Sequence, residues 1–60
     1  MRYEKLDDLP SHIKTILSED CQEYYMSIYN DAYDDYQNEI IAHKIAIAAV
    51  EFSCLKQKRR

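Results

Sequence analysis

The sequence contains no glycine, and Pro10 is its only proline. Without glycine, the chain has no residue that adopts positive φ freely, so tight hairpin turns and glycine-rich phosphate-binding loops are largely excluded. The P-loop motif and the dinucleotide-binding fingerprint both require glycines, so neither can occur in this sequence. The fold class that remains is all-α, a set of helices joined by few turns.

Long apolar runs are also missing. The longest uninterrupted one is Ile45–Val50, whereas a membrane-spanning helix needs about 20 apolar residues. The N-terminus is polar and unlike a secretory signal. The two cysteines, Cys21 and Cys54, form neither a CxxC motif nor a framework of the secreted type. We therefore expect a soluble intracellular protein in a reducing compartment, without membrane insertion.

The 60 residues are expected to form one small domain. A chain of this length buries only about 60% of the surface that its unfolded form exposes, so a disulfide, a metal or oligomerisation would help to stabilise it. Its charge is unevenly spread. Residues 1–38 carry three bases and nine acids, and residues 39–60 carry five bases and two acids. This distribution excludes a uniformly basic nucleic-acid binder.

A short first helix is predicted over residues 10–17. Pro10 fits a first helical turn, where its missing N–H would have no intrahelical partner. Residues 1–8 before it are polar and are expected to be irregular. The predicted core face of this helix recurs at helical spacing and consists of Leu9, Ile13, Ile16 and Leu17.

A long amphipathic helix is predicted over residues 19–36. Ser18 is a suitable N-cap, and Glu19 and Asp20 follow in the first turn, where the helix dipole favours anions. The remaining surface is anionic, because the segment holds six acids and no base. The predicted core face consists of Cys21, Tyr25, Ile28, Tyr29, Ala32 and Tyr36.

A third helix is predicted over residues 39–56, and it is apolar around most of its circumference. Between Ile40 and Val50, only His43 and Lys44 are polar. Such a helix is usually buried on several sides, and a single chain of 60 residues offers little protein to cover it. We therefore expect either a central helix or one that meets a second subunit, and we predict a homodimer.

Only Gln37-Asn38 separates the two long helices. Asparagine tolerates the left-handed conformation, so this pair can close an antiparallel helix hairpin. Alternatively, the helices fuse into one, because neither glycine nor proline interrupts the stretch, and each half packs on a second chain in a swapped dimer. In both arrangements, Cys21 and Cys54 lie at the same height along the axes of the two antiparallel helices. These cysteines are expected either to pack as small apolar side chains or to form a disulfide on oxidation.

Four segments of the chain resemble the ChaB family, in the same order as in its members. The family shows a DLP start, an AQxxY segment, an FNxAWDQY segment and an AHKVAWAAV segment. The corresponding segments here are Asp8-Leu9-Pro10, Cys21–Tyr25, Tyr29–Tyr36 and Ala42–Val50.

The chain departs from the family at Tyr33 and Ile47, where members typically have tryptophan. It also lacks the charged loop that bacterial members carry between the second and third helices, and this short form resembles ChaB-like proteins of large insect DNA viruses. The resemblance implies a mostly helical fold with a minor strand pair and a nominal role as a regulator of cation transport. For viral relatives it implies nucleic-acid binding, and for a viral chain a location that includes the host nucleus.

No catalytic, cofactor or metal site is predicted. A nucleophilic serine or cysteine needs an adjacent base oriented by a third group, and no such spacing is present. A zinc site needs about four convergent ligands, and His12 lies at no ligand spacing from the cysteines. His43 is expected to be a hydrogen-bonded structural histidine, level with Ala32 in an antiparallel helix pair.

The predicted function is that of a small non-enzymatic accessory protein that associates with DNA. Phosphate contacts of this kind are salt-sensitive and largely independent of sequence. The predicted contact residues are Lys44, Lys56, Lys58, Arg59 and Arg60. Two alternatives stay open: the final basic residues only solubilise the chain, or the anionic surface of residues 19–36 binds a protein partner, as in a ChaB-type regulator of cation transport.

Overall fold

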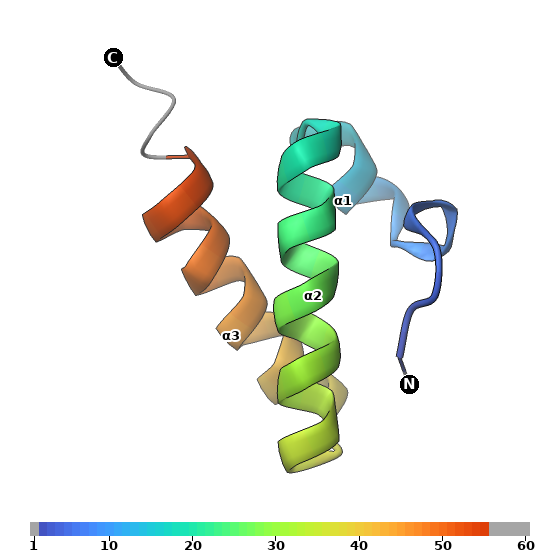
Figure 1. Cartoon of the computed structure of the whole chain (residues 1–60), viewed down its shortest axis with the longest axis vertical. Helices are drawn as coiled ribbons and strands as arrows, with labels where there is room; N and C mark the ends of the chain where they lie inside the picture. Colours follow the sequence, from blue (N-terminus) through green and yellow to red (C-terminus); the bar gives the residue numbers. More distant parts are fainter. Residues whose placement is uncertain (1, 56–60) are drawn as a thin grey trace.

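The computed structural model describes residues 2–55 and places two longer helices against each other, with a short helix before them (Figure 1). The described residues contain no strand. The all-α prediction is therefore confirmed, and the minor strand pair implied by the family resemblance is not found in this part of the chain. The elements in chain order are the 3-10 turn η1 (Leu6–Asp8), α1 (Ser11–Ile16), α2 (Glu19–Tyr36), α3 (Glu39–Ala49) and the π-helical segment η2 (Val50–Leu55).

Helix α2 begins where its N-cap was predicted. The Ser18 hydroxyl oxygen accepts a hydrogen bond from the backbone N–H of Cys21 at 3.4 Å. Glu19 and Asp20 occupy the first turn, where carboxylates complement the unpaired N–H groups and the positive end of the helix dipole. The observed bounds of α2 match the predicted residues 19–36.

The chain reverses at the two-residue connector, so within one chain α2 and α3 form a hairpin rather than a continuous helix. Gln37 adopts the left-handed conformation, with φ 54° and ψ 37°, and its N–H donates to the Tyr33 carbonyl oxygen at 2.7 Å. Asn38 is the N-cap of α3, and its Oδ1 accepts from the N–H of Ile41 at 3.0 Å. The asparagine is therefore used for capping, and the glutamine takes the conformation that was expected of the asparagine.

Replacing Gln37 by glycine should raise the free energy of unfolding by about 0.5–1 kcal/mol. A residue with a Cβ is strained in the left-handed region, and glycine relieves that strain. Urea unfolding followed by circular dichroism measures the change. The matched control is Gln22→Gly, which should be destabilising, because it puts glycine inside α2 and removes the side-chain hydrogen bond to the Leu17 carbonyl at 2.9 Å. Lower stability of Gln37→Gly would contradict the observed turn.

The core runs along the inner side of the hairpin and under α1. Two predicted core residues are not in it: Ile16 is 61% and Tyr36 is 57% exposed. Each is the last residue of its helix. The chain turns extended at Leu17, which is buried in place of Ile16. Tyr36 directly precedes the connector Gln37-Asn38. Ile28 is only half-buried. The buried residues are Leu9, Ile13, Leu17, Cys21, Tyr25, Tyr29, Ala32, Ala42, Ala46 and Val50.

The expected third helix over residues 39–56 divides into two parts. It is α-helical to Ala49 and π-helical over residues 50–55, and residue 56 lies outside the described range. A π-helical turn contains more residues and changes the direction of the side chains that follow it. The altered geometry fits the position of Cys54 against the first turn of α2, described below.

Candidate functional site

The predicted phosphate-binding residues are only partly placed by the structure. Lys44 lies on α3 with an exposed side chain, and no ion pair holds it among residues 2–55. The remaining four, Lys56, Lys58, Arg59 and Arg60, lie outside the described residues. Of the five predicted cations, the structure therefore locates Lys44, on the surface of α3.

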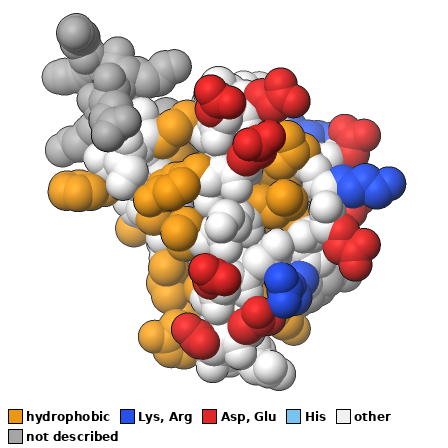
Figure 2. All heavy atoms as spheres, viewed as in Figure 1, with side chains coloured by type: hydrophobic (Ala, Val, Ile, Leu, Met, Phe, Trp, Pro, Cys, Tyr) orange, Lys and Arg blue, Asp and Glu red, His pale blue; other side chains and the backbone are white. Residues whose placement is uncertain are grey.

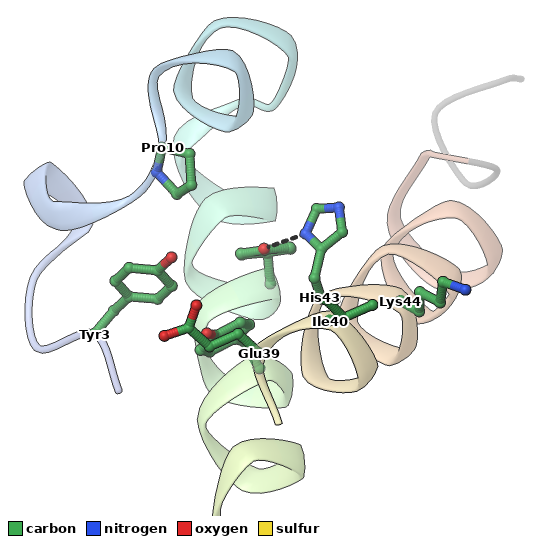
Figure 3. Close-up of a pocket in the computed structure, with 8 residues that line it drawn as sticks. Tyr3, Pro10, Glu39, Ile40, His43 and Lys44 are labelled. Carbon is green, nitrogen blue, oxygen red and sulfur yellow. Dashed lines mark hydrogen bonds between the residues drawn. The ribbon is translucent and has the colours of Figure 1, made fainter. Parts of the chain in front are cut away.

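A pocket of about 260 Å³ opens between the N-terminal segment, α2 and α3 (Figure 3). Its walls are mainly aromatic and aliphatic, and a carboxylate, an imidazole and an ammonium group stand at its α3 side. Sequence reasoning missed it, because no local spacing indicates that residues near the N-terminus meet α3. The lining residues are Tyr3, Pro10, Tyr25, Tyr29, Glu39, Ile40, His43 and Lys44.

A short hydrogen bond joins the two longer helices at this pocket. The Tyr25 hydroxyl and His43 Nδ1 lie 2.7 Å apart (Figure 3). Burial raises the pKa of Tyr25, and the neighbouring Tyr3 and Tyr29 add to the effect, so the phenol stays protonated at neutral pH and has a hydrogen to donate. The structural role predicted for His43 is confirmed. Its expected level beside Ala32 stays a prediction.

Tyr29 forms the floor of the pocket beside the N-terminal segment. Its ring lies 4.8 Å from that of Tyr3, centroid to centroid, and 6.0 Å from that of Tyr25. Burial, followed by Tyr3 and the carboxylate of Glu39, raises the pKa of Tyr29 to about 12. No serine or cysteine lines this pocket. The arrangement can hold an apolar group and form hydrogen bonds.

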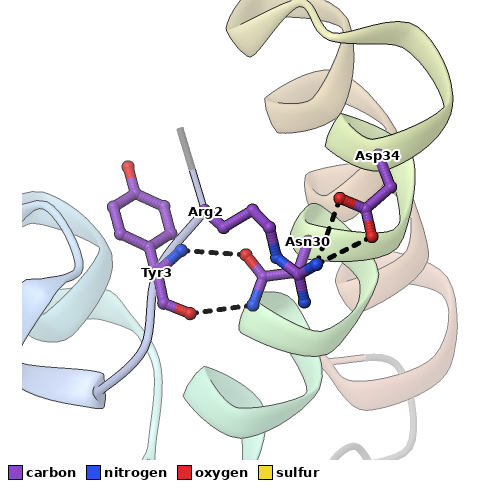
Figure 4. A network of polar contacts seen from close by, with 4 residues as sticks. All are labelled: Arg2, Tyr3, Asn30 and Asp34. Atoms are coloured by element: carbon purple, nitrogen blue, oxygen red, sulfur yellow. Dashed lines mark hydrogen bonds and ion pairs between the residues drawn. The ribbon is translucent and has the colours of Figure 1, made fainter.

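The N-terminal segment is fixed to α2 by a polar network that sequence reasoning also missed (Figure 4). The Tyr3 N–H donates to Asn30 Oδ1 at 2.9 Å, and Asn30 Nδ2 donates to the Tyr3 carbonyl oxygen at 2.8 Å. Arg2 forms an ion pair with Asp34 at 2.9 Å, with both side chains about half exposed. The paired residues are 27 and 32 positions apart, so no local pattern could have indicated them. This network holds Tyr3 over the pocket.

Cys21 and Cys54 are joined by a disulfide, with their Cα atoms 6.0 Å apart. The antiparallel arrangement predicted that these residues are level, and that prediction is confirmed. Of the two expectations for their chemistry, the structure shows the disulfide. The bond ties the end of η2 to the first turn of α2.

His12 and His43 approach each other more closely than their spacing in the sequence indicates. Their ring centroids lie 6.2 Å apart in an edge-on arrangement. Within residues 2–55, however, no group of three histidine, cysteine, aspartate or glutamate side chains is placed to hold a metal ion. In the same part of the chain, no helix has the length and apolar character required to cross a membrane.

Comparison with known families identifies the family of this chain. The family model ChaB matches residues 9–58, which is most of the chain. The chain belongs to the ChaB family. No curated protein and no solved structure matches it significantly.

The four segments that carry the ChaB resemblance converge on the pocket. Pro10 comes from the DLP segment, Tyr25 and Tyr29 from the two segments on α2, and His43 and Lys44 from the segment on α3. Within this ChaB-family chain, these residues therefore form one structural unit, although they are spread over 35 positions. Ala42, next to His43, is completely buried against α2.

Proposed function

We propose that this ChaB-family chain is a non-catalytic accessory protein that associates with nucleic acid through its basic C-terminal part. The observation that carries the proposal is the separation of charge along the chain. Residues 2–55 hold four bases and eleven acids, whereas residues 56–60 hold four bases and no acid. A phosphate backbone is repelled by the first part and attracted by the second. We therefore expect the C-terminal end to make most of the phosphate contacts.

Lys44 extends this basic set onto the described surface. Its side chain is exposed, and it has no ion pair within residues 2–55 that would compete with a phosphate. From Lys44, α3 continues to Ala49 and η2 to Leu55, and the basic residues 56–60 follow directly in the sequence.

A duplex DNA titration at two salt concentrations tests the proposal. Five phosphate contacts predict a log–log slope of about −4.5, so that the affinity falls roughly 10²–10³-fold between about 50 and about 200 mM salt. Deleting residues 56–60 removes four of the five cations and should reduce the slope to about −1. Lys44→Gln alone should reduce its magnitude by about one.

Lys5→Gln is the matched control, since it removes one exposed base at the other end of the chain and should leave the slope unchanged. Absence of binding at low salt would show that the proposal is wrong. Binding that survives the deletion with the same slope would also contradict it, because the contact would then lie outside the C-terminal part.

A second candidate function is a regulator that binds a cationic protein through α2, in the manner of the ChaB-type role in cation transport. The observation that favours it is the acidic surface of this helix, on which Asp34 alone has an ion pair among the described residues. Cation efflux should be compared in cells with the wild-type protein, without it, and with Glu23→Gln/Asp31→Asn/Asp35→Asn. Efflux that changes with the protein and reverts with the triple variant would support this function. Equal efflux in all three would exclude it.

A further inference from the structure

The Cys21–Cys54 disulfide lies at the junction between the described fold and the basic end of the chain. It joins the first turn of α2 to η2, with the two Cα atoms 6.0 Å apart. Lys56 follows Cys54 by two positions, so their Cα atoms are at most about 7 Å apart. The bond therefore keeps the beginning of residues 56–60, which we call the basic segment, close to the start of α2.

The start of α2 is acidic. Glu19 and Asp20 occupy its first turn, and both are exposed. Among residues 2–55, neither carboxylate forms an ion pair. Acidic side chains gather around this end of α2, whereas the surface over α3 is mainly hydrophobic (Figure 2). The disulfide therefore anchors the most basic part of the sequence beside carboxylates of the same chain.

The contacts of η2 show in which direction it leads. The Tyr24 hydroxyl donates to Ser53 Oγ at 3.4 Å, and the next residue, Cys54, is bonded to Cys21. Along η2, the partner on α2 therefore moves toward the start of that helix. Asp20 precedes Tyr24 by four positions, so both lie on the same side of α2. The chain that continues from Cys54 thus starts next to the side of α2 that carries Asp20.

We propose that the Cys21–Cys54 disulfide is a redox switch for the phosphate contact of the basic segment, weak in the oxidised protein and stronger in the reduced one. This inference rests on the proposed association with nucleic acid. Opposite charges within about 10 Å of each other attract at moderate salt, so a base that is held beside Asp20 is partly neutralised before a phosphate arrives. Reduction removes the tether, and the base becomes available to the nucleic acid.

The reductant that operates the switch is a dithiol. Cys54 is half-buried and Cys21 is 2% exposed, so the thiolate of the dithiol attacks Cys54 Sγ. A mixed disulfide forms there, and Cys21 leaves as a thiolate in the first turn of α2, where helix N–H groups favour an anion. The second thiol then displaces Cys54, and the reagent closes to a cyclic disulfide. Two electrons and two protons pass from the dithiol to the two protein sulfurs.

A duplex DNA titration of one sample before and after treatment with dithiothreitol tests the proposal. The reduced protein should bind about fivefold more tightly, the effect of releasing one exposed ion pair. Its log–log salt slope should be larger in magnitude by about one, because one more cation contacts a phosphate. Deleting residues 56–60 should abolish both differences. Thiol counting confirms the redox state, and circular dichroism confirms that the helical content is kept.

Asp20→Asn tests the switch in a protein that keeps its disulfide and hence its fold. In the oxidised state it should bind DNA up to about fivefold more tightly than the wild type, and it should lose most of the response to dithiothreitol. Asp35→Asn is the matched control. It removes the same charge from an exposed position 15 residues further along α2, about 22 Å away, and should behave as the wild type does.

The outcomes separate the switch from the function on which it rests. Absence of binding in both redox states overturns the proposed function and the switch together. Binding that is equal in the two states, or tighter in the oxidised one, overturns the switch alone. A gain on reduction that comes with loss of the helical signal, and that Asp20→Asn does not reproduce in the oxidised protein, is an effect of unfolding and also overturns the switch.

Discussion

Reducing the Cys21–Cys54 disulfide should lower the free energy of unfolding by roughly 3.7 kcal/mol. The bond joins residues 33 positions apart, and the chain-entropy relation for a closed loop of about that length gives this value at room temperature. Single domains of this size are stable by only several kcal/mol. We therefore expect the reduced protein to be partly unfolded under conditions in which the oxidised protein is folded.

Urea unfolding of the same sample with and without a reductant measures this effect without changing any other atom. The matched variant is Cys21→Ala/Cys54→Ala, which should resemble the reduced protein and should not respond to the reductant. Thiol counting provides the control for the starting state, since untreated native protein should have no free thiol. Equal stability of the oxidised and reduced forms would show that the loop is already constrained by the packing of α2 and α3.

The disulfide also links the stability of the chain to its environment. A reducing compartment was expected from the small number and the spacing of the cysteines, and there the loop between Cys21 and Cys54 would open. The segment that would be released is η2, which leads into the basic residues 56–60. The proposed nucleic-acid contact therefore follows directly on the part of the chain that the bond holds, so binding should be measured in both redox states.

The helices of this protein were predictable because their ends have strong local signals. Ser18 and Asn38 cap α2 and α3 with side-chain oxygen atoms, and the apolar spacing between these caps is helical. The level of Cys21 and Cys54 followed from the short connector alone. Capping and periodicity depend on residues within a few positions of each other, which a single sequence shows directly.

The pocket was not predictable, because it depends on contacts between distant residues. Asn30 looks like an ordinary polar position on α2, and only the structure shows that it holds the backbone of Tyr3. His43 was correctly expected to be hydrogen-bonded, but its partner Tyr25 was not identified. Backbone levels along an antiparallel pair do not indicate which partner a side chain as long as tyrosine reaches.

The stability of the fold should fall steeply in alkaline solution, between about pH 10 and pH 12. Tyr25 and Tyr29 are buried, and burial is the main cause that raises the pKa of each, for Tyr29 to about 12. Tyrosines of the unfolded chain lose their protons near pH 10, so above this pH the unfolded state binds fewer protons than the folded one. The stabilisation from the neutral phenols is fully present below about pH 10 and is lost as the pH rises through the folded pKa values.

Urea unfolding at a series of pH values from about 8 to about 12 measures this loss. Tyr29→Phe keeps the ring and removes the proton, so its stability should fall less steeply above about pH 10 than that of the wild type. Tyr36→Phe is the matched control, because its ring is 57% exposed and its replacement should leave the slope unchanged. Recovery of the helical signal on return to about pH 8 shows that the unfolding is reversible. If the free energy of unfolding of Tyr29→Phe fell with pH as steeply as that of the wild type, the Tyr29 hydroxyl would be hydrated in the folded state. The core beneath the pocket would then be accessible to water.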